Sequence, residues 1–223
     1  ARPAASYLPP ALWNHHAGLA PDPHDPGAAR RLLAQAGWRD RDGDGVRERA
    51  GRPLRLEILY RGGDPGTDDV AAVVRQNLQA VGVQVRLRAL ELATALEFLR
   101  AGEFDAFLGE YQANLYADPS PLVASGATDR FNFGRYANAR VDSLLAAALA
   151  EPERARSRPL WEAVQEELAA DPPAAVLYYL RQIVGVDRRL RDVRPHMLSV
   201  LDNVDEWWIA PRDRRWAAPA GPE

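Results

Sequence analysis

Residues 54–108 decide the fold: LRLEILYRGGDPGTDDVAAVVRQNLQAVGVQVRLRALELATALEFLRAGEFDAFL. Apolar and polar residues alternate over 54–60 and over 83–90, which is the period of a β-strand with one buried face. The short apolar run at 104–108 is typical of a third, buried strand. The sequence therefore predicts three strands within this stretch.

Two helices are expected between these strands. The first covers 67–80, where Val70, Val73, Val74 and Leu78 form an apolar stripe that ends before Gly82. The second covers 91–101 and stops at Gly102. Strand, helix, strand, helix, strand at this spacing predicts an α/β fold with a βαβαβ parallel sheet and right-handed crossovers.

The loop that follows the third strand is the best candidate for a binding site. Ligands of such sheets lie beyond the carboxyl ends of the strands, and the loop at 109–120 starts at that edge. It mixes aromatic and polar residues, as binding loops do. We expect the following residues to line a cleft, together with two further candidates before the next helix: Glu110, Tyr111, Gln112, Asn114, Tyr116 and Asp118, with Asn132 and Tyr136.

The flanking segments predict further elements around this core. A helix over 28–36 follows the N-cap Asp25 and Pro26, and Gly37 ends it. Two later helices, at 138–150 with Asn138 as N-cap and at 156–170, precede two short strands at 175–180 and 182–187. We divide the chain into an N-terminal coil at 1–25, a lobe at 26–210 and a frayed tail at 211–223.

Composition narrows the classes of function. The chain has 223 residues, a net charge of −3 and no cysteine, which excludes disulfides and thiolate chemistry and gives no sign of a nucleic-acid partner. No apolar run is long enough to span a membrane, and residues 1–5 carry no signal-peptide apolar region. The protein is therefore either cytoplasmic or exported by a signal outside this chain.

An acidic turn is the main candidate for a metal site. Asp40, Asp42 and Asp44, with Gly45, match the first positions of a calcium loop, and Glu48 could contribute. The twelfth position, normally a bidentate glutamate, is Gly51. The alternative is a turn whose carboxylates bind nearby backbone N–H groups, and we favour it.

The sequence gives little support for a histidine metal site or for catalysis. His15, His16 and His24 suggest nickel or zinc, but adjacent histidines diverge in most backbones, so a mobile coil is the preferred interpretation. No G-x-S-x-G, Walker A, H-E-x-x-H or Rossmann glycine motif occurs, and we expect no cofactor and no enzyme activity. A weaker alternative is an enzyme that uses the carboxylates of Glu110 and Asp118.

Seven segments resemble, in order, the peptide/nickel (family 5) solute-binding proteins of ABC transporters. DPGAARRLLAQAGW at 25–38 resembles the family's "YDPEKAKKLLAEAGW", and DRDGDGVR at 40–47 resembles its "DTDGDGIR" turn. The remaining segments are 81–85 (VGVQV), 104–105 (FD), 136–142 (YANARVD), 161–179 (WEAVQEELAADPPAAVLYY) and 206–208 (EWW).

The resemblance implies the C-terminal lobe of a two-lobed binding protein that closes on a peptide, metal chelate or related solute. Such proteins are periplasmic or cell-surface lipoproteins, and they deliver the solute to an ABC permease. It also implies that an N-terminal lobe lies outside this chain. An alternative is the ligand-sensing domain of a transcription regulator with the same fold.

Two positions depart from the family pattern. Peptide-binding relatives carry an aspartate four residues before the proline of "GW-ADY-DP", and it binds the α-ammonium group of the peptide. That position, counted back from Pro119, is Leu115, and the usual tryptophan after the glycine is Glu110. We therefore do not expect a free peptide N-terminus as ligand, although Glu110 or Asn114 could substitute for the missing aspartate.

Overall fold

The protein is described from a computed structural model, and the structure describes residues 1–112, 117–181, 183–196 and 199–214. Within these ranges, no helix is both long enough and apolar enough to cross a membrane. The helices and strands in chain order are β1 (Arg2–Pro3), α1 (Pro26–Gln35), β2 (Glu48–Arg49), β3 (Arg52–Pro53), β4 (Arg55–Arg61), α2 (Pro65–Gln79), β5 (Gln84–Leu90), α3 (Leu92–Ala101), β6 (Ala106–Leu108), α4 (Ser120–Val123), α5 (Ala139–Ala150), α6 (Arg154–Ala170), β7 (Tyr178–Tyr179), β8 (Leu190–Arg191), η1 (Val204–Glu206), β9 (Trp208–Ile209) and η2 (Pro211–Asp213).

A parallel sheet forms the first half of the molecule, as predicted. β4 lies in the middle and pairs in parallel with β5 and β6. Ile58 of β4 lies opposite Leu87 and Ala106, so the apolar residues of all three strands share one face. The predicted βαβαβ unit is confirmed, with strand boundaries shifted by one or two residues.

Helices cover both faces of this sheet. On one face, Val74 and Leu78 of α2 and Leu33 of α1 pack with buried Ile58. On the other, α3 lies against β4, and the guanidinium of Arg88 stands 4.3 Å from the ring centre of Phe98. The sheet is therefore a sandwiched layer, as parallel sheets normally are.

Local signals set the helix ends. The carboxylate of Asp25 accepts a hydrogen bond from the Ala28 amide at 2.8 Å, and Pro26 occupies the first turn of α1. Asp64 caps α2 through the Thr67 amide in the same way. α3 ends at Gly102, whose φ of +74° is the left-handed conformation that glycine adopts without strain.

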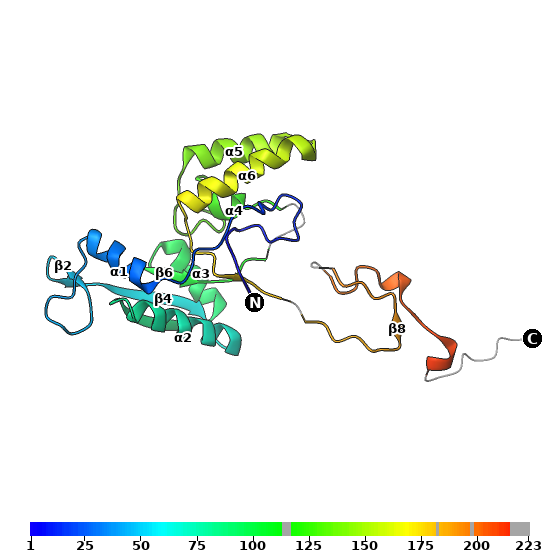
Figure 1. Ribbon diagram of the computed structural model, residues 1–223, viewed down its shortest axis with the longest axis horizontal. Helices are drawn as coiled ribbons and strands as arrows, with labels where there is room; N and C mark the ends of the chain where they lie inside the picture. Colours follow the sequence, from blue (N-terminus) through cyan, green and yellow to red (C-terminus); the bar gives the residue numbers. More distant parts are fainter. Residues whose placement is uncertain (113–116, 182, 197–198, 215–223) are drawn as a thin grey trace, which may run out of the picture.

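A second, helical core lies beside the sheet. α5 and α6 run side by side (Figure 1) and bury Val141, Leu145, Trp161 and Val164 between them. Leu8, near the start of the chain, belongs to the same cluster and is 1% exposed. The N-terminal coil is thus packed into the body of the molecule.

The two C-terminal strands differ from the prediction. Only Tyr178–Tyr179 forms a strand in the first predicted segment, and residues 183–187 form none, while residue 182 lies outside the described residues. β7 pairs antiparallel with β1, at the opposite end of the sequence. A pairing between such distant segments leaves no local pattern, so the sequence of residues 1–25 predicted only coil.

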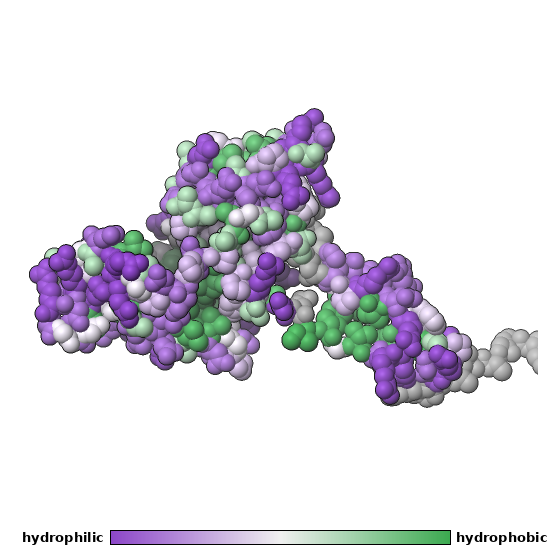
Figure 2. Space-filling view, in the orientation of Figure 1, coloured by the Kyte–Doolittle hydropathy of each residue, from purple (hydrophilic) through white to green (hydrophobic). Residues whose placement is uncertain are grey.

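After β7 the chain leaves the body as an extended C-terminal arm, which we define as residues 183–196 and 199–214 (Figure 1). It carries the short β8–β9 pair. Apolar side chains gather on the arm in Figure 2, and its exposed large apolar residues are Ile183, Val186, Leu201, Val204 and Trp208. Neither core cluster includes a residue of the arm.

Candidate functional site

The 109–120 loop starts where the sequence predicted, at the carboxyl edge of the sheet. Tyr60 and Leu108 lie side by side near the ends of β4 and β6. A Cβ atom at Gly109 would stand 2.3 Å from the ring of Phe107, so only glycine lets the chain leave the strand past this ring. The start of the loop is therefore set by local packing.

Three predicted residues lie together at the beginning of the loop. Glu110, Tyr111 and Gln112 are all exposed. The hydroxyl of Tyr111 donates to the carbonyl of Asp118 at 3.3 Å, which joins the two ends of the loop. Partial burial raises the pKa of Tyr111, and the negative charge of Asp118 adds to this rise, so the phenol remains a hydrogen-bond donor at neutral pH.

Asp118 shapes the end of the loop. Its Oδ1 atom accepts hydrogen bonds from the backbone amide and the hydroxyl of Ser120, at 2.9 and 2.5 Å. These bonds form the turn that leads into α4. The Oδ1 atom of Asp118 therefore stabilises this turn. The remaining predicted residues of the loop, Asn114 and Tyr116, and also Leu115, lie outside the described residues.

Asn132 has a different role from the one predicted. It is 2% exposed. Its Nδ2 donates to the carbonyls of Ala124 and Tyr136, at 3.0 and 2.8 Å, and its Oδ1 accepts from the Tyr136 amide at 2.9 Å. Since these bonds hold its own loop and the side chain is buried, we remove Asn132 from the candidate site.

Tyr136 packs against the helical core, a cluster that also contains Ala117 of the 109–120 loop. Burial raises the pKa of Tyr136; Asn138 opposes the shift and the charge of Asp171 adds to it. Its hydroxyl is buried and has no hydrogen-bond partner within the described residues.

Two open depressions lie on the surface. One, of about 360 Å³, borders the end of the loop and is lined by Ser120, Pro121, Ala124, Gly126, Ala127, Asp129 and Arg130. Asp129 and Arg130 are residues that the sequence did not single out. The other, of about 700 Å³, includes Arg55, Gln84 and Asp105, which stand at the amino ends of the strands. Only the first is therefore near the candidate site.

The acidic turn forms the backbone-bonded structure that we favoured. Asp40 accepts from the amides of Gly43 and Gly45, at 2.8 and 3.0 Å, and Asp44 accepts from the Val46 amide at 2.7 Å. Carboxylate oxygens of Asp40, Asp42 and Glu48 also lie within 4.8 Å of one another, without Asp44. These exposed groups could hold a cation, but their existing bonds explain the turn without one.

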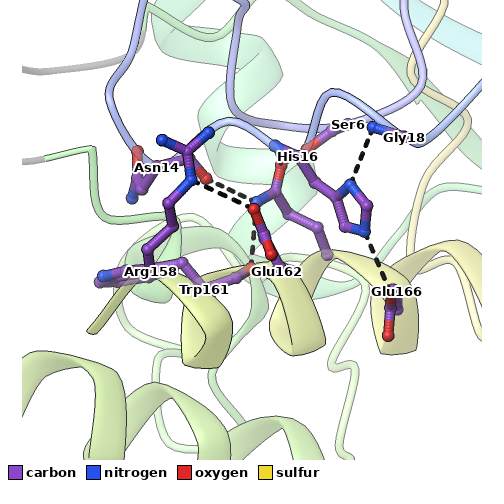
Figure 3. Close-up of polar contacts among 9 residues, drawn as sticks. Ser6, Asn14, His16, Gly18, Arg158, Trp161, Glu162 and Glu166 are labelled. Atoms are coloured by element: carbon purple, nitrogen blue, oxygen red, sulfur yellow. Dashed lines mark hydrogen bonds and ion pairs between the residues drawn. The ribbon is translucent and has the colours of Figure 1, made fainter. Parts of the chain in front are cut away.

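The adjacent histidines His15 and His16 have different hydrogen-bond partners. His15 Nδ1 lies 2.7 Å from the Leu8 carbonyl. His16 Nε2 lies 3.0 Å from a Glu166 carboxylate oxygen of α6, and His16 Nδ1 accepts from the Gly18 amide (Figure 3). The two rings therefore have separate partners, and the carboxylate beside His16 comes from a residue 150 positions away in sequence.

Comparison with protein-family models identifies the family of this chain. A family model described as "Bacterial extracellular solute-binding proteins, family 5 Middle" matches residues 1–134, which is more than half of the chain. The chain belongs to this family. The resemblance noted from short motifs is thereby confirmed.

Two curated family 5 relatives illustrate the match. The oligopeptide-binding protein AppA of Bacillus subtilis (strain 168) is 25% identical over 212 residues, which cover 92% of this chain and 39% of the relative. The nickel-binding periplasmic protein of Escherichia coli (strain K12) is 29% identical over 122 residues, with 55% and 23% covered. Both are named as binding proteins, and neither name supports the regulator alternative.

A solved family 5 structure has the same fold. AppA from Bacillus subtilis in complex with a nonapeptide superposes with a TM-score of 0.76 at 23% identity, over 94% of this chain and 42% of that chain. The fold is thus that of a lobe of these proteins. The chain spans about two fifths of the length of the AppA relative, so the activity of a complete protein is a matter for proposal.

Proposed function

We propose that this chain is the C-terminal lobe of a solute-binding protein of an ABC importer, which binds its ligand reversibly and performs no chemistry. The observation that carries the proposal is the 109–120 loop of a family 5 chain. It leaves the carboxyl edge of a parallel sheet and exposes Glu110, Tyr111 and Gln112 there. Aromatic and polar side chains at this edge are what a solute cleft requires.

The proposed ligand is a peptide or a related small solute. AppA is named for oligopeptides and was solved with a nonapeptide, while another relative is named for nickel. Leu115 replaces the aspartate that holds a peptide α-ammonium group in the family pattern, and Glu110 replaces its tryptophan. We therefore propose that ligand recognition here relies on Tyr111, with Glu110 available to a cationic group of the solute.

The proposal includes a second lobe and a membrane partner. Binding proteins of this kind close two lobes over the solute, and the 109–120 loop would form one wall of that cleft. The apolar side chains of the C-terminal arm, such as Leu201 and Trp208, are suited to contact the second lobe. The complete protein would work in the periplasm or as a cell-surface lipoprotein, with a permease as partner.

Calorimetry tests the proposal directly. We expect a two-lobed protein that contains this chain to bind at least one of three probes with micromolar affinity: a nonapeptide, a nickel–histidine complex or a hexasaccharide. Tyr111→Ala should weaken that binding about tenfold, because it removes the exposed ring. The 223-residue chain alone should bind the same probe weakly or not at all, since it supplies half of the cleft.

Two results would contradict the proposal. Micromolar binding by the isolated chain would show that one lobe is sufficient. Full affinity in the Tyr111→Ala variant would move the ligand away from the 109–120 loop. Leu32→Ala, at an exposed position of α1, serves as a control substitution outside the candidate site.

A further inference from the structure

The side chain of Asn14 connects the N-terminal segment to the 109–120 loop. It is 0% exposed. Its Nδ2 donates to the carbonyl of Ala117 at 3.0 Å, across a separation of 103 residues in sequence. Burying an amide costs free energy unless its polar groups have partners. The Oδ1 atom of Asn14 has none within the described residues, so the bond from Nδ2 to Ala117 is the one that offsets this cost.

Ala117 needs such a partner because of its backbone conformation. Its φ is +52°, in the left-handed region that residues with a Cβ atom rarely adopt. It is also 1% exposed and belongs to the helical core cluster. A strained conformation persists only where the surroundings hold it. The side-chain amide of Asn14 donates a hydrogen bond to the carbonyl of Ala117 itself.

Asn14 is itself held in place by α6. Gln165, which is 2% exposed, donates through Nε2 to the carbonyl of Asn14 at 2.8 Å. Its Oε1 accepts from the Ser6 hydroxyl at 2.7 Å and from the His16 amide at 3.1 Å. Figure 3 shows Ser6, Asn14 and His16 lying along α6. These bonds hold the N-terminal segment, and Asn14 within it, against α6.

We propose that Asn14 is a positioning residue for the 109–120 loop. Its Nδ2 binds the carbonyl of Ala117, near the end of the loop. The hydroxyl of Tyr111, near the start of the loop, binds the carbonyl of the next residue, Asp118. Asn14 thereby sets the direction in which the loop leaves the body. The role of the loop in ligand binding rests on the proposed function, whereas its positioning by Asn14 can be measured without a ligand.

Hydrogen exchange of the 223-residue chain tests the positioning. In Asn14→Asp, an ionised carboxylate can no longer donate to Ala117 and is repelled by its carbonyl. We expect the amides of buried Ala117 and of Ser120, which donates to Asp118, to exchange at least tenfold faster at neutral pH, with α5 and α6 unchanged. As the pH falls and the new carboxyl gains a proton, it can donate again, and protection should return after correction for intrinsic exchange rates.

Ser6→Ala is the matched control. It removes another bond to Gln165 but leaves the Asn14–Ala117 bond intact, so exchange in 109–120 should stay within about twofold of the parent. Equal acceleration in both variants, or none in Asn14→Asp, would overturn the proposal. If Asn14→Asp does not fold, Asn14→Ser is neutral, too short to reach Ala117, and carries the same expected acceleration at all pH values.

Binding separates this inference from the proposed function. With whichever probe binds the two-lobed protein, Asn14→Asp should lower the affinity about tenfold and Ser6→Ala should not. Faster loop exchange without loss of affinity would confirm the positioning and contradict the role of the loop in binding. Loss of affinity without a change in loop exchange would contradict the positioning.

Discussion

Tyr7 lies where the N-terminal segment meets the chain that follows α6, and its hydroxyl donates to the Ala174 carbonyl at 3.5 Å. Burial raises the pKa of Tyr7 from 10.0 to about 12, and Tyr136 adds to the rise. The folded protein therefore holds this phenolic proton more tightly than the unfolded chain does.

This difference predicts a loss of stability in alkali. Because the folded pKa exceeds the unfolded one, the stabilisation is complete below pH 10 and is lost as the pH rises from 10.0 to about 12. The loss should be on the order of 2 kcal/mol from this group. Urea unfolding at pH 9, 10, 11 and 12 measures it.

Tyr7→Phe is the matched variant, since it keeps the ring and removes the titrating group. Its free energy of unfolding should decline less steeply over this range than that of the parent. An equally steep decline would assign the alkaline loss to other groups.

Single asparagines show what sequence can reveal about individual residues. Asn138 was predicted as an N-cap, because a helix start leaves amides that need a local acceptor, and this is confirmed. Asn132 was placed in the cleft, but its partners are carbonyls fixed by the fold of its own loop. Asn14 gave no signal at all, since its partner lies on a segment far away in sequence.

At the scale of elements, the N-terminus of α5 depends on one side chain. Asn138 Oδ1 accepts from the amides of Arg140 and Val141, at 3.0 and 3.2 Å, and its Nδ2 donates to Asp171 at 3.2 Å. The same residue therefore caps α5 and ties it to the end of α6.

We expect Asn138→Ala to lower the free energy of unfolding by about 1–2 kcal/mol, measured by urea denaturation. Asn138→Ser keeps a cap acceptor and should recover most of that loss. If the serine variant were as unstable as the alanine variant, the bond to Asp171, rather than the cap, would be the main contribution.

Elements with a strong period and defined ends were predictable. β4, α2, β5 and α3 follow the expected order because each carries its own pattern and its own cap or glycine stop. The two-residue strands β1 and β7 were not, since they are too short to carry a period and their pairing depends on the folded body. The site loop was located because its position follows from the parallel sheet, while the contacts that hold it could not be read from spacing.

At the scale of the whole molecule, the body and the C-terminal arm differ in how they are stabilised. The body contains both apolar clusters, whereas the arm extends away from it with its apolar side chains exposed (Figures 1 and 2). The arm thus adds little to the stability of the body.

A chain that ends after residue 181 should therefore keep its melting temperature within a few degrees of the parent. It retains β7, its pairing with β1, and the Tyr179 hydroxyl that donates to Ser6 at 2.8 Å. Calorimetric melting of both chains provides the measurement. A fall of more than 10 °C or so would show that the arm packs on the body in solution.

The pairing of β1 with β7 also constrains the order of folding during synthesis. Residues near the start of the chain, Leu8 and Asn14 among them, find their partners on α6 and β7, which leave the ribosome much later. The sheet of β4, β5 and β6 has all its strands before then. The helical core would thus close only after α6 and β7 have been made, and the segment around Leu8 and Asn14 would stay open to chaperones or export factors until that moment.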